Sequence, residues 1–358
     1  MSQRLMGFFA EEGYEHVNPP LVEFEDSFFG GAGAAMTRDT FRLMDPASQR
    51  MMVVRSDMTV QVARIATTRL AGVPRPLRLA YVGQVLRIRG TQTRPQRQFR
   101  QAGFELIGSA LAAADAEVIL LAARSLRRLG VTDLTIDLNL PTLVPAVCAE
   151  LGFEGEELAR LKAALDRKDA TTVSLIAAGN RILLDLLKAS GPAEGAPERL
   201  SRLDLPSAGV DAVQHLESVI SLVRREAPDL NLTVDAVEHR GFEYHTGTSF
   251  AIFAQGVRSE LGRGGRYLAG SRNSDPSGEP AVGVTLYMDM VQAALPKPGP
   301  IPRLFVPFGT PYPDCRRWQE KGWVTIRGLE ATTDETAEAL RLRCTHRLVG
   351  GVAAALGD

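Results

Sequence analysis

The spacing of apolar and polar residues along the chain predicts both strands and helices. Two extended segments, 77–88 and 97–107, flank a polar and basic loop at 90–96 and predict a long hairpin. A shorter hairpin is expected from 41–44 and 50–55, around Asp45-Pro46. Further strands are predicted at 14–24, 134–140, 232–237, 242–253 and 256–267. Pro19-Pro20 interrupts the first of these strands, which places it at an edge or an interface.

Helices are predicted where apolar residues recur at helical spacing. These segments are 2–11, 59–70, 111–129, 212–225 and 284–294. Hairpins dominate over crossovers among the predicted strands. The pattern therefore favours an α+β fold, in which helices flank an antiparallel sheet.

Two changes in composition divide the chain. Residues 141–208 are rich in Ala and Leu, helical in period, and predict a helical insertion in a large domain that spans 1–295. Residues 296–302 hold four prolines in seven positions and are expected to form a linker. Residues 303–358 then show a short β-α-β-α-β pattern, which predicts a small C-terminal α/β domain.

Composition excludes several classes of protein. The formal net charge of −1 offers no general attraction for nucleic acid. Cys148, Cys315 and Cys344 are far apart, which argues against a disulfide scaffold or a zinc site and fits a reducing cytoplasm. No apolar run approaches the ~20 residues that a membrane helix needs. We therefore expect a cytoplasmic protein with neither a metal site nor a membrane contact.

The strand at 97–107 carries polar residues on one face. Gln101 and Glu105 share that face with Gly103, whereas Phe104 and its even-numbered neighbours form the core face. Gln101 and Glu105 lie roughly 13 Å apart at the rise of a strand. The pair could bind the two ends of a small ligand, such as an amine and an imidazole N–H, with Gly103 leaving room between them. The alternative is a solvated sheet face.

Several other residues allow two interpretations each. Arg240 shares a strand face with Tyr244 and could bind a carboxylate or form an interface salt bridge. Asp57 could bind an ammonium group or cap the helix that follows it. His245 is more typical of a packed side chain than of a ligand contact. Five arginines around the basic loop could bind phosphate or be solvated: Arg87, Arg89, Arg94, Arg97 and Arg100.

Four segments, in order, resemble signature segments of class II synthetases of the histidyl-tRNA synthetase family. They are Arg55-Ser56-Asp57-Met58-Thr59, the strand Arg97 to Glu105, Arg240-Gly241-Phe242-Glu243-Tyr244-His245, and Gly264-Gly265-Arg266-Tyr267. Pro20 stands at the proline of that family's dimer-interface motif. The resemblance covers roughly residues 5–295 and implies a pocket for L-histidine. The residues that it implies in this pocket are Asp57, Thr59, Arg87, Gln101, Glu105, Arg240, Tyr244 and Tyr267.

The chain departs from the family at the positions that handle ATP. The family's Phe-Arg-x-Glu motif is Leu86-Arg87-Ile88-Arg89 here, so an arginine replaces the acid. Met290 stands where the family has the arginine that binds the ATP γ-phosphate, and methionine has no hydrogen-bond donor. The residues after the proline linker also look shorter than the family's anticodon-binding domain. ATP activation and tRNA recognition are therefore both in question, whereas the amino-acid pocket is kept.

A histidine pocket without adenylation resembles one non-catalytic branch of that family, the regulatory subunits of ATP phosphoribosyltransferase. This resemblance implies a homodimer, formed through residues 13–24, within a hetero-oligomer that contains the short-form catalytic subunit. It implies L-histidine as a feedback ligand, no catalytic residue, no cofactor and no tRNA partner. Two rival interpretations stay open at this point: an active histidyl-tRNA synthetase, and a synthetase-like RNA-binding module.

Overall fold

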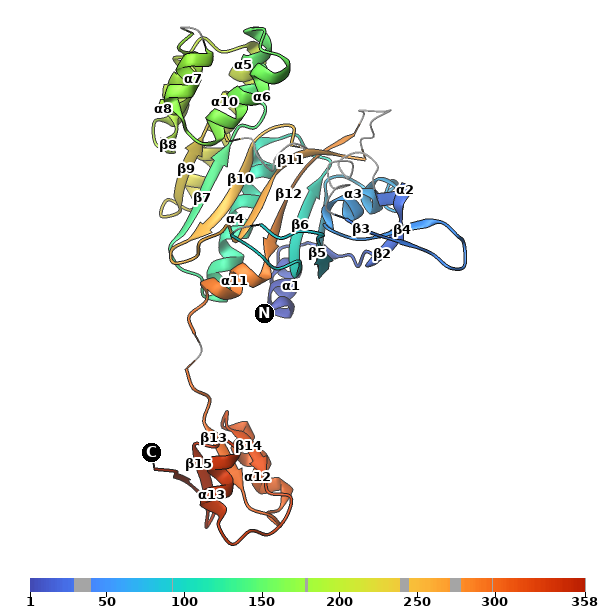
Figure 1. The fold of residues 1–358 in the computed structure, drawn as a ribbon, viewed down its shortest axis with the longest axis vertical. Coiled ribbons are helices and arrows are strands. Elements are labelled where there is room, and N and C mark those ends of the chain that lie inside the picture. The colour runs from blue at the N-terminus through green and yellow to red at the C-terminus, as the bar shows by residue number, and fades with distance from the viewer. Residues whose placement is uncertain are drawn as a thin grey trace. The chain divides into compact units, whose positions relative to one another are not determined.

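The computed structural model describes residues 1–28, 40–91, 93–177, 180–238, 245–270, 278–297 and 299–357. The chain forms two compact units, Met1–Leu295 and Pro296–Asp358. Each unit has its own sheet and its own apolar core (Figure 1).

Nine strands of the described residues form the central sheet of the first unit. Their order across the sheet is β1 (Glu15–His16), β5 (Leu77–Leu86), β6 (Gln98–Ile107), β12 (Glu279–Tyr287), β11 (Gly262–Ala269), β10 (Ser249–Ala254), β7 (Leu134–Asn139), β9 (Asn231–Asp235) and β8 (Gly191–Pro192). The β1–β5 and β7–β9 pairs are parallel, and the other pairs are antiparallel. The α+β prediction and the long 77–107 hairpin are therefore confirmed.

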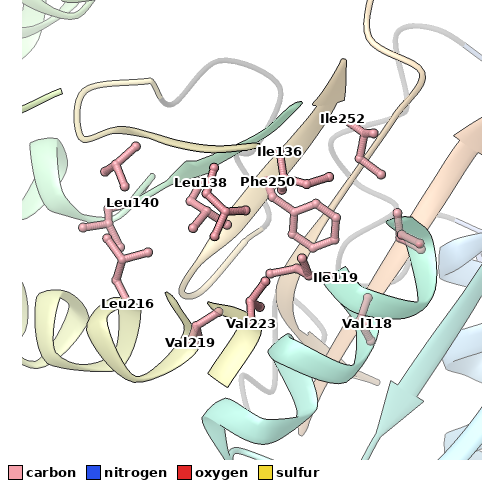
Figure 2. Close-up of a cluster of buried hydrophobic side chains, with 14 of the residues drawn as sticks. Val118, Ile119, Ile136, Leu138, Leu140, Leu216, Val219, Val223, Phe250 and Ile252 are labelled. Atoms are coloured by element: carbon pink, nitrogen blue, oxygen red, sulfur yellow. The ribbon is translucent and has the colours of Figure 1, made fainter. Parts of the chain in front are cut away.

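Helices cover both faces of this sheet. Ile136, Leu138 and Phe250 point from β7 and β10 towards Ile119 of α4 (Ala112–Leu129) and Val223 of α10 (Ser207–Glu226), as Figure 2 shows. The helix α1 (Ser2–Glu11) packs on the same face, because its Phe9 contacts Phe104 of β6. The helix α3 (Thr59–Thr67) packs on the opposite face. Residues of β6 are consequently buried on both sides.

The remaining elements of the first unit are short. Residues between β7 and α10 form α5 (Leu143–Glu150), α6 (Gly155–Asp166), α7 (Ala170–Ile176), α8 (Ile182–Ala189) and α9 (Ala196–Ser201), with β8 between the last two. A second sheet has the strand order β2 (Val22–Phe24), β4 (Met51–Val54), β3 (Phe41–Met44). Along the chain, α2 (Glu25–Phe28) follows β2 and α3 follows β4. The short hairpin prediction is confirmed by β3 and β4.

Three predicted elements of the first unit are wrong in part. Residues 284–287, expected to begin a helix, end strand β12, and only α11 (Met288–Ala294) is helical. Both faces of β12 are buried, so its sequence lacks the alternation that identifies a strand. The expected strands at 14–24 and 256–267 are also shorter in the structure. β1 and β2 are separate, and β11 begins at Gly262.

The second unit is a four-stranded sheet with a helix on each face. Its strands are β13 (Arg303–Val306), β14 (Val324–Arg327), β15 (His346–Val349) and β16 (Val352–Ala355), in the order β14-β13-β15-β16. Leu304 and Val306 pack with Cys315 of α12 (Tyr312–Glu320), whereas Phe305 packs with Ala339 of α13 (Glu335–Arg341). The predicted β-α-β-α-β pattern is confirmed, and β16 is an addition that the sequence prediction missed.

Within the described residues, no helix combines the length and the apolar character needed to cross a membrane.

Candidate functional site: a buried acid pocket on the central sheet

Strand β6 and the start of α3 form a buried polar cluster on the central sheet. Gln101 is 0% exposed and Glu105 is 1% exposed, so the alternative of a solvated sheet face is wrong. The face is covered because the segment from Asp57 to α3 packs over it. Burying these polar side chains requires hydrogen-bond partners, and the structure supplies them.

Asp57 and Gln101 form one end of the cluster. Gln101 Nε2 donates to Asp57 Oδ2 at 2.8 Å, and the Met58 N–H donates to Gln101 Oε1 at 3.2 Å. Asp57 Oδ1 accepts the N–H of Thr59 at 2.8 Å, in the first turn of α3. Asp57 therefore binds the helix start and faces Gln101 at the same time. The N-cap residue of α3 is Met58, so Asp57 stabilises the helix start from one position before the cap, and its role in ligand binding stays a prediction.

Glu105 forms the other end and accepts hydrogen bonds from three hydroxyls. Thr59 Oγ1 and Tyr81 Oη lie 3.0 and 3.1 Å from Glu105 Oε1, and Tyr267 Oη lies 2.9 Å from Glu105 Oε2. The structure thus brings together Asp57, Thr59, Gln101, Glu105 and Tyr267, which the sequence analysis placed in one site. Because both ends carry an acid, the arrangement suits a small ligand with hydrogen-bond donors at both ends.

Tyr81 is a site residue that the sequence analysis missed. It lies opposite Gly103 in the β5–β6 pair, and its hydroxyl also lies 2.8 Å from Thr285 Oγ1. A Cβ at Gly103 would come within 2.5 Å of the Tyr81 hydroxyl oxygen. The space over Gly103 is therefore filled by the Tyr81 side chain, so the expectation that this glycine leaves room between Gln101 and Glu105 is wrong. This pairing depends on the register of the hairpin, which the folded structure shows and the sequence pattern did not.

Burial has a large electrostatic effect on this cluster. Removal from water raises the pKa of Glu105 to about 8, even though the hydroxyls of Tyr267, Thr59 and Tyr81 favour its ionised form. Burial also raises the pKa of Tyr81 well above 10, so Tyr81 keeps its proton. Glu105 can consequently change its protonation state near neutral pH, where the tyrosine cannot.

We predict that Glu105→Gln removes a pH dependence of stability. The folded-state pKa of Glu105, about 8, lies above its ordinary value of 4.5. Between these two pH values the folded chain holds a proton that the unfolded chain has released, so the stabilising contribution of Glu105 is fully present only below pH 4.5. It declines between pH 4.5 and about 8 by up to ~1.4 kcal/mol per pH unit for this group. Urea unfolding at several pH values should show this slope for the ligand-free chain and a shallower one for Glu105→Gln.

The matched control for that experiment is Glu150→Gln, because Glu150 is exposed at the end of α5. This variant should keep the slope of the unsubstituted chain. An equal slope in the chain and in Glu105→Gln would contradict the prediction.

The structure shows no side-chain hydrogen bond between the cluster and the other predicted site residues, among those that it describes. Arg87 is half-buried, with Nε 3.5 Å from the Ser56 carbonyl and its guanidinium 5.2 Å from the Phe99 ring centre. Arg240 and Tyr244 lie outside the described residues. His245 is buried, in agreement with its interpretation as a packed residue. The structure thus leaves the role of Arg87 as a prediction.

The arginines of the basic loop do not form one cluster. Arg89, Arg97 and Arg100 are exposed, which agrees with the solvated interpretation for these three. Arg94 is 6% exposed, and its guanidinium lies between two aromatic rings. Arg94 is therefore set apart from the other arginines, and phosphate binding by this loop stays a prediction.

A second buried ionic group lies on the face of the sheet opposite the pocket. Arg266, which precedes Tyr267 on β11, donates from Nε and Nη2 to Asp115 Oδ2 of α4, at 3.0 and 2.5 Å. It also donates to the carbonyls of Ser109 and Leu111. His215 Nε2 of α10 lies 3.0 Å from the same Asp115 oxygen. This group joins the strand of Tyr267 to two helices, and the sequence analysis gave Arg266 no role.

Among the described residues there is no cluster of three or more His, Cys, Asp or Glu side chains that could hold a metal ion.

Comparison with known proteins places this chain in a family. A family model described as histidyl-tRNA synthetase matches residues 1–291. An ATP phosphoribosyltransferase regulatory subunit of Paramagnetospirillum magneticum is 54% identical over 345 residues, which is 96% of this chain and 89% of the relative. The chain belongs to the family of ATP phosphoribosyltransferase regulatory subunits. A further member of this regulatory-subunit family, from Rhodospirillum centenum, is 52% identical over 350 residues, 97% of this chain and 89% of the relative.

The fold of this chain is similar to those of solved structures. An ATP phosphoribosyltransferase regulatory subunit/histidyl-tRNA synthetase from Bacillus halodurans has a TM-score of 0.76 at 22% identity, covering 94% of this chain and 90% of its own. The HisG:HisZ ATP phosphoribosyltransferase complex from Thermotoga maritima matches with a TM-score of 0.61 at 16% identity, covering 80% of this chain and 96% of its own. At these identities the structures show the fold, which confirms the class II resemblance.

Proposed function

We propose that this chain is the non-catalytic regulatory subunit of ATP phosphoribosyltransferase and binds L-histidine in the acid pocket. The short-form catalytic subunit would carry out the first step of histidine biosynthesis, a glycosyltransferase reaction, and this chain would convey histidine feedback to it. The observation that carries the proposal is the buried pair of acidic ends, Asp57 with Gln101 and Glu105 with its three hydroxyls.

The chemistry of the two ends suits histidine. The Asp57 carboxylate and the amide oxygen of Gln101 accept hydrogen bonds, as the α-ammonium group requires. Glu105 can bind an imidazole in either protonation state. The ionised carboxylate accepts from a ring N–H, and the protonated carboxyl donates to the bare ring nitrogen. Because the pKa of Glu105 is about 8, both forms are available near neutral pH.

The residues at the ATP positions support a role without adenylation. Met290 is partly buried against the apolar residues of α11 and the sheet, and it offers no donor to a phosphate. Arg89, at the place of the family's acid, is exposed. These departures and the regulatory-subunit relatives favour this function over an active synthetase and over an RNA-binding module.

Feedback from such a pocket requires coupling between subunits. Histidine bound here would act on chemistry in another chain, so the two sites share a coupling free energy, typically ~1–3 kcal/mol. We place the homodimer contact in residues 13–24 and the assembly in the cytoplasm. A two-fold dimer is the commonest closed assembly and would give equal numbers of the two chains.

The proposal is tested by mixing the chain with a short-form catalytic subunit. The mixture should form a stable complex whose phosphoribosyltransferase activity is inhibited by histidine. Asp57→Ala or Tyr267→Phe should raise the histidine concentration for half-inhibition about tenfold, because each removes a hydrogen bond of the pocket worth ~1–2 kcal/mol. Turnover without histidine should remain largely intact in both variants.

Tyr14→Phe is the matched control for Tyr267→Phe. Its hydroxyl bonds Glu117 at 3.0 Å, and its ring packs on Phe104, on the core face of β6. It should therefore keep full histidine sensitivity. Pocket variants with unchanged histidine sensitivity would place the feedback site elsewhere, and the absence of any complex would overturn the partner role.

A further inference from the structure

One face of the three-stranded sheet β2-β4-β3 carries only apolar side chains that stay partly exposed. Each strand contributes two of them, because directly paired residues point to the same side of a sheet. They are Val22 and Phe24 of β2, Met52 and Val54 of β4, and Phe41 and Leu43 of β3. Leu43 is exposed and the other five are half-buried. We call this surface the apolar face, and a contiguous apolar patch of this kind is typical of an interaction site.

The opposite face of the same sheet turns towards α3. Glu23 pairs with Val53 across β2 and β4, and the two residues are 8% and 0% exposed. The Glu23 carboxylate forms an ion pair with Arg64, in the last turn of α3. Three residues earlier on the helix, Gln61 Nε2 donates to the Pro20 carbonyl at 2.9 Å. A single layer of strands therefore separates the apolar face from the helix that covers the acid pocket.

The chain between this sheet and α3 is held to the same segment. Arg55 follows β4 directly, and its N–H donates to the Leu21 carbonyl at 3.0 Å. Arg55 Nη1 donates to the Pro19 carbonyl at 2.7 Å, and the residue is 5% exposed. Two residues later comes Asp57, which forms one end of the acid pocket. A displacement of residues 19–23 would therefore move both Asp57 and α3.

The charges at the rim of the apolar face suit a second copy of this chain. Arg42 pairs with Glu25 at 2.8 Å, and Arg50 pairs with Asp26 at 3.3 Å. The rim thus carries both signs of charge. In a two-fold contact each surface meets its own copy, so a rim with both signs can be complementary to itself. Strand β2 also belongs to residues 13–24, which the proposed function assigns to the homodimer contact.

We propose that the apolar face binds a second copy of this chain, and that Glu23, Gln61 and Arg64 couple this contact to the acid pocket. Histidine binding requires α3 to be seated on the sheet, since the start of this helix supplies residues to both ends of the pocket. The bonds of Gln61 and Arg64 make the seating of α3 depend on β2, which the second copy would hold in place. Histidine and the second copy would then strengthen each other's binding by the same factor. The inference rests on the proposed function and gives it a path from the pocket to a subunit interface.

The contact is tested by sedimentation of the full chain over a dilution series, with and without saturating L-histidine. Histidine should lower the dissociation constant of the dimer at least tenfold. Leu43→Glu should weaken the dimer, because a charge would enter the apolar contact. It should also bind histidine at least tenfold more weakly, although Leu43 lies outside the pocket. Val210→Glu is the matched control, because Val210 of α10 is 40% exposed against 39% for Leu43. This variant should behave like the unsubstituted chain.

Arg64→Met tests the coupling, because it keeps a long side chain and removes the ion pair with Glu23. In this variant histidine should change the dimer dissociation constant by less than about threefold, against about tenfold or more in the unsubstituted chain. Arg64→Lys, which keeps the charge, should retain most of the effect. Arg78→Met is the matched control, since Arg78 forms its ion pair with Glu117 of α4, on the other face of the central sheet. It should retain the full effect.

Gln61→Leu removes the bond to the Pro20 carbonyl and serves if Arg64→Met does not fold. Equal dimer dissociation constants with and without bound histidine would overturn the coupling. So would a full histidine effect in folded Arg64→Met or Gln61→Leu. A Leu43→Glu variant that dimerises like the unsubstituted chain would overturn the contact. If the unsubstituted chain bound no histidine, the proposed function would fail together with the coupling, and Leu43→Glu would still decide the contact face.

Discussion

Gly283→Ala is expected to abolish histidine binding to the acid pocket. Gly283 pairs with Glu105 across strands β12 and β6, and the Glu105 carboxylate lies over the glycine Cα. An added Cβ would overlap Glu105 Oε2, so the carboxylate would have to leave its three hydroxyl partners. Displacing a buried group that holds one end of the ligand should cost ~3 kcal/mol or more, which is at least a hundredfold in affinity.

Calorimetry with L-histidine measures this effect directly. Gly72→Ala is the control, because a Cβ at Gly72 meets no atom within 4 Å. It should bind histidine like the unsubstituted chain. If circular dichroism shows that Gly283→Ala is folded, retained histidine affinity would mean that Glu105 does not hold the ligand.

Asp115→Ala is expected to destabilise the first unit by ~3–5 kcal/mol. Asp115 is 1% exposed and is the carboxylate that faces the buried Arg266 guanidinium and His215. Removing one partner of a buried ion pair leaves the other charge in a medium of low dielectric, which is the source of the cost. Two carbonyls would remain bonded to Arg266, and they do not neutralise its charge.

Urea unfolding measures this loss in the free energy of unfolding, and the exposed ion pair of Asp229 with Arg127 provides the comparison. Asp229 is 70% exposed and bonds Arg127 at 2.9 Å, so Asp229→Ala should change stability by less than ~1 kcal/mol. Similar values for the two aspartate variants would show that the Asp115 group contributes no more than a surface salt bridge.

The sequence predicted those parts of the fold and site that depend on local pattern. The 77–107 hairpin was found because a polar, basic loop separates two extended segments. Gln101 and Glu105 were found because two polar residues share one face of an otherwise apolar strand. The resemblance to one family then predicted L-histidine as the ligand of these residues. The structure brings Asp57, Thr59 and Tyr267 to the same cluster, from α3 and β11.

Tertiary packing decided what the sequence could not show. Tyr81 was missed because a tyrosine in a strand is an ordinary core residue, and only the folded hairpin shows it over Gly103. The end of β12 was predicted as helix because burial on both faces removes alternation. Arg94 could not be distinguished from four neighbouring arginines, since its burial depends on how one loop closes against Tyr287.

The start of α3 supplies residues to both ends of the pocket. Asp57 bonds Gln101, and Thr59, two residues later, bonds Glu105. A rigid shift of this helix start would therefore break both ends in one step, and neither end can be lost alone by such a motion. Under such a motion, the hydrogen bonds at the two ends would be made or broken together. In the proposed histidine sensor, the free energy that holds this helix start against the sheet would therefore set the histidine concentration at which the response occurs.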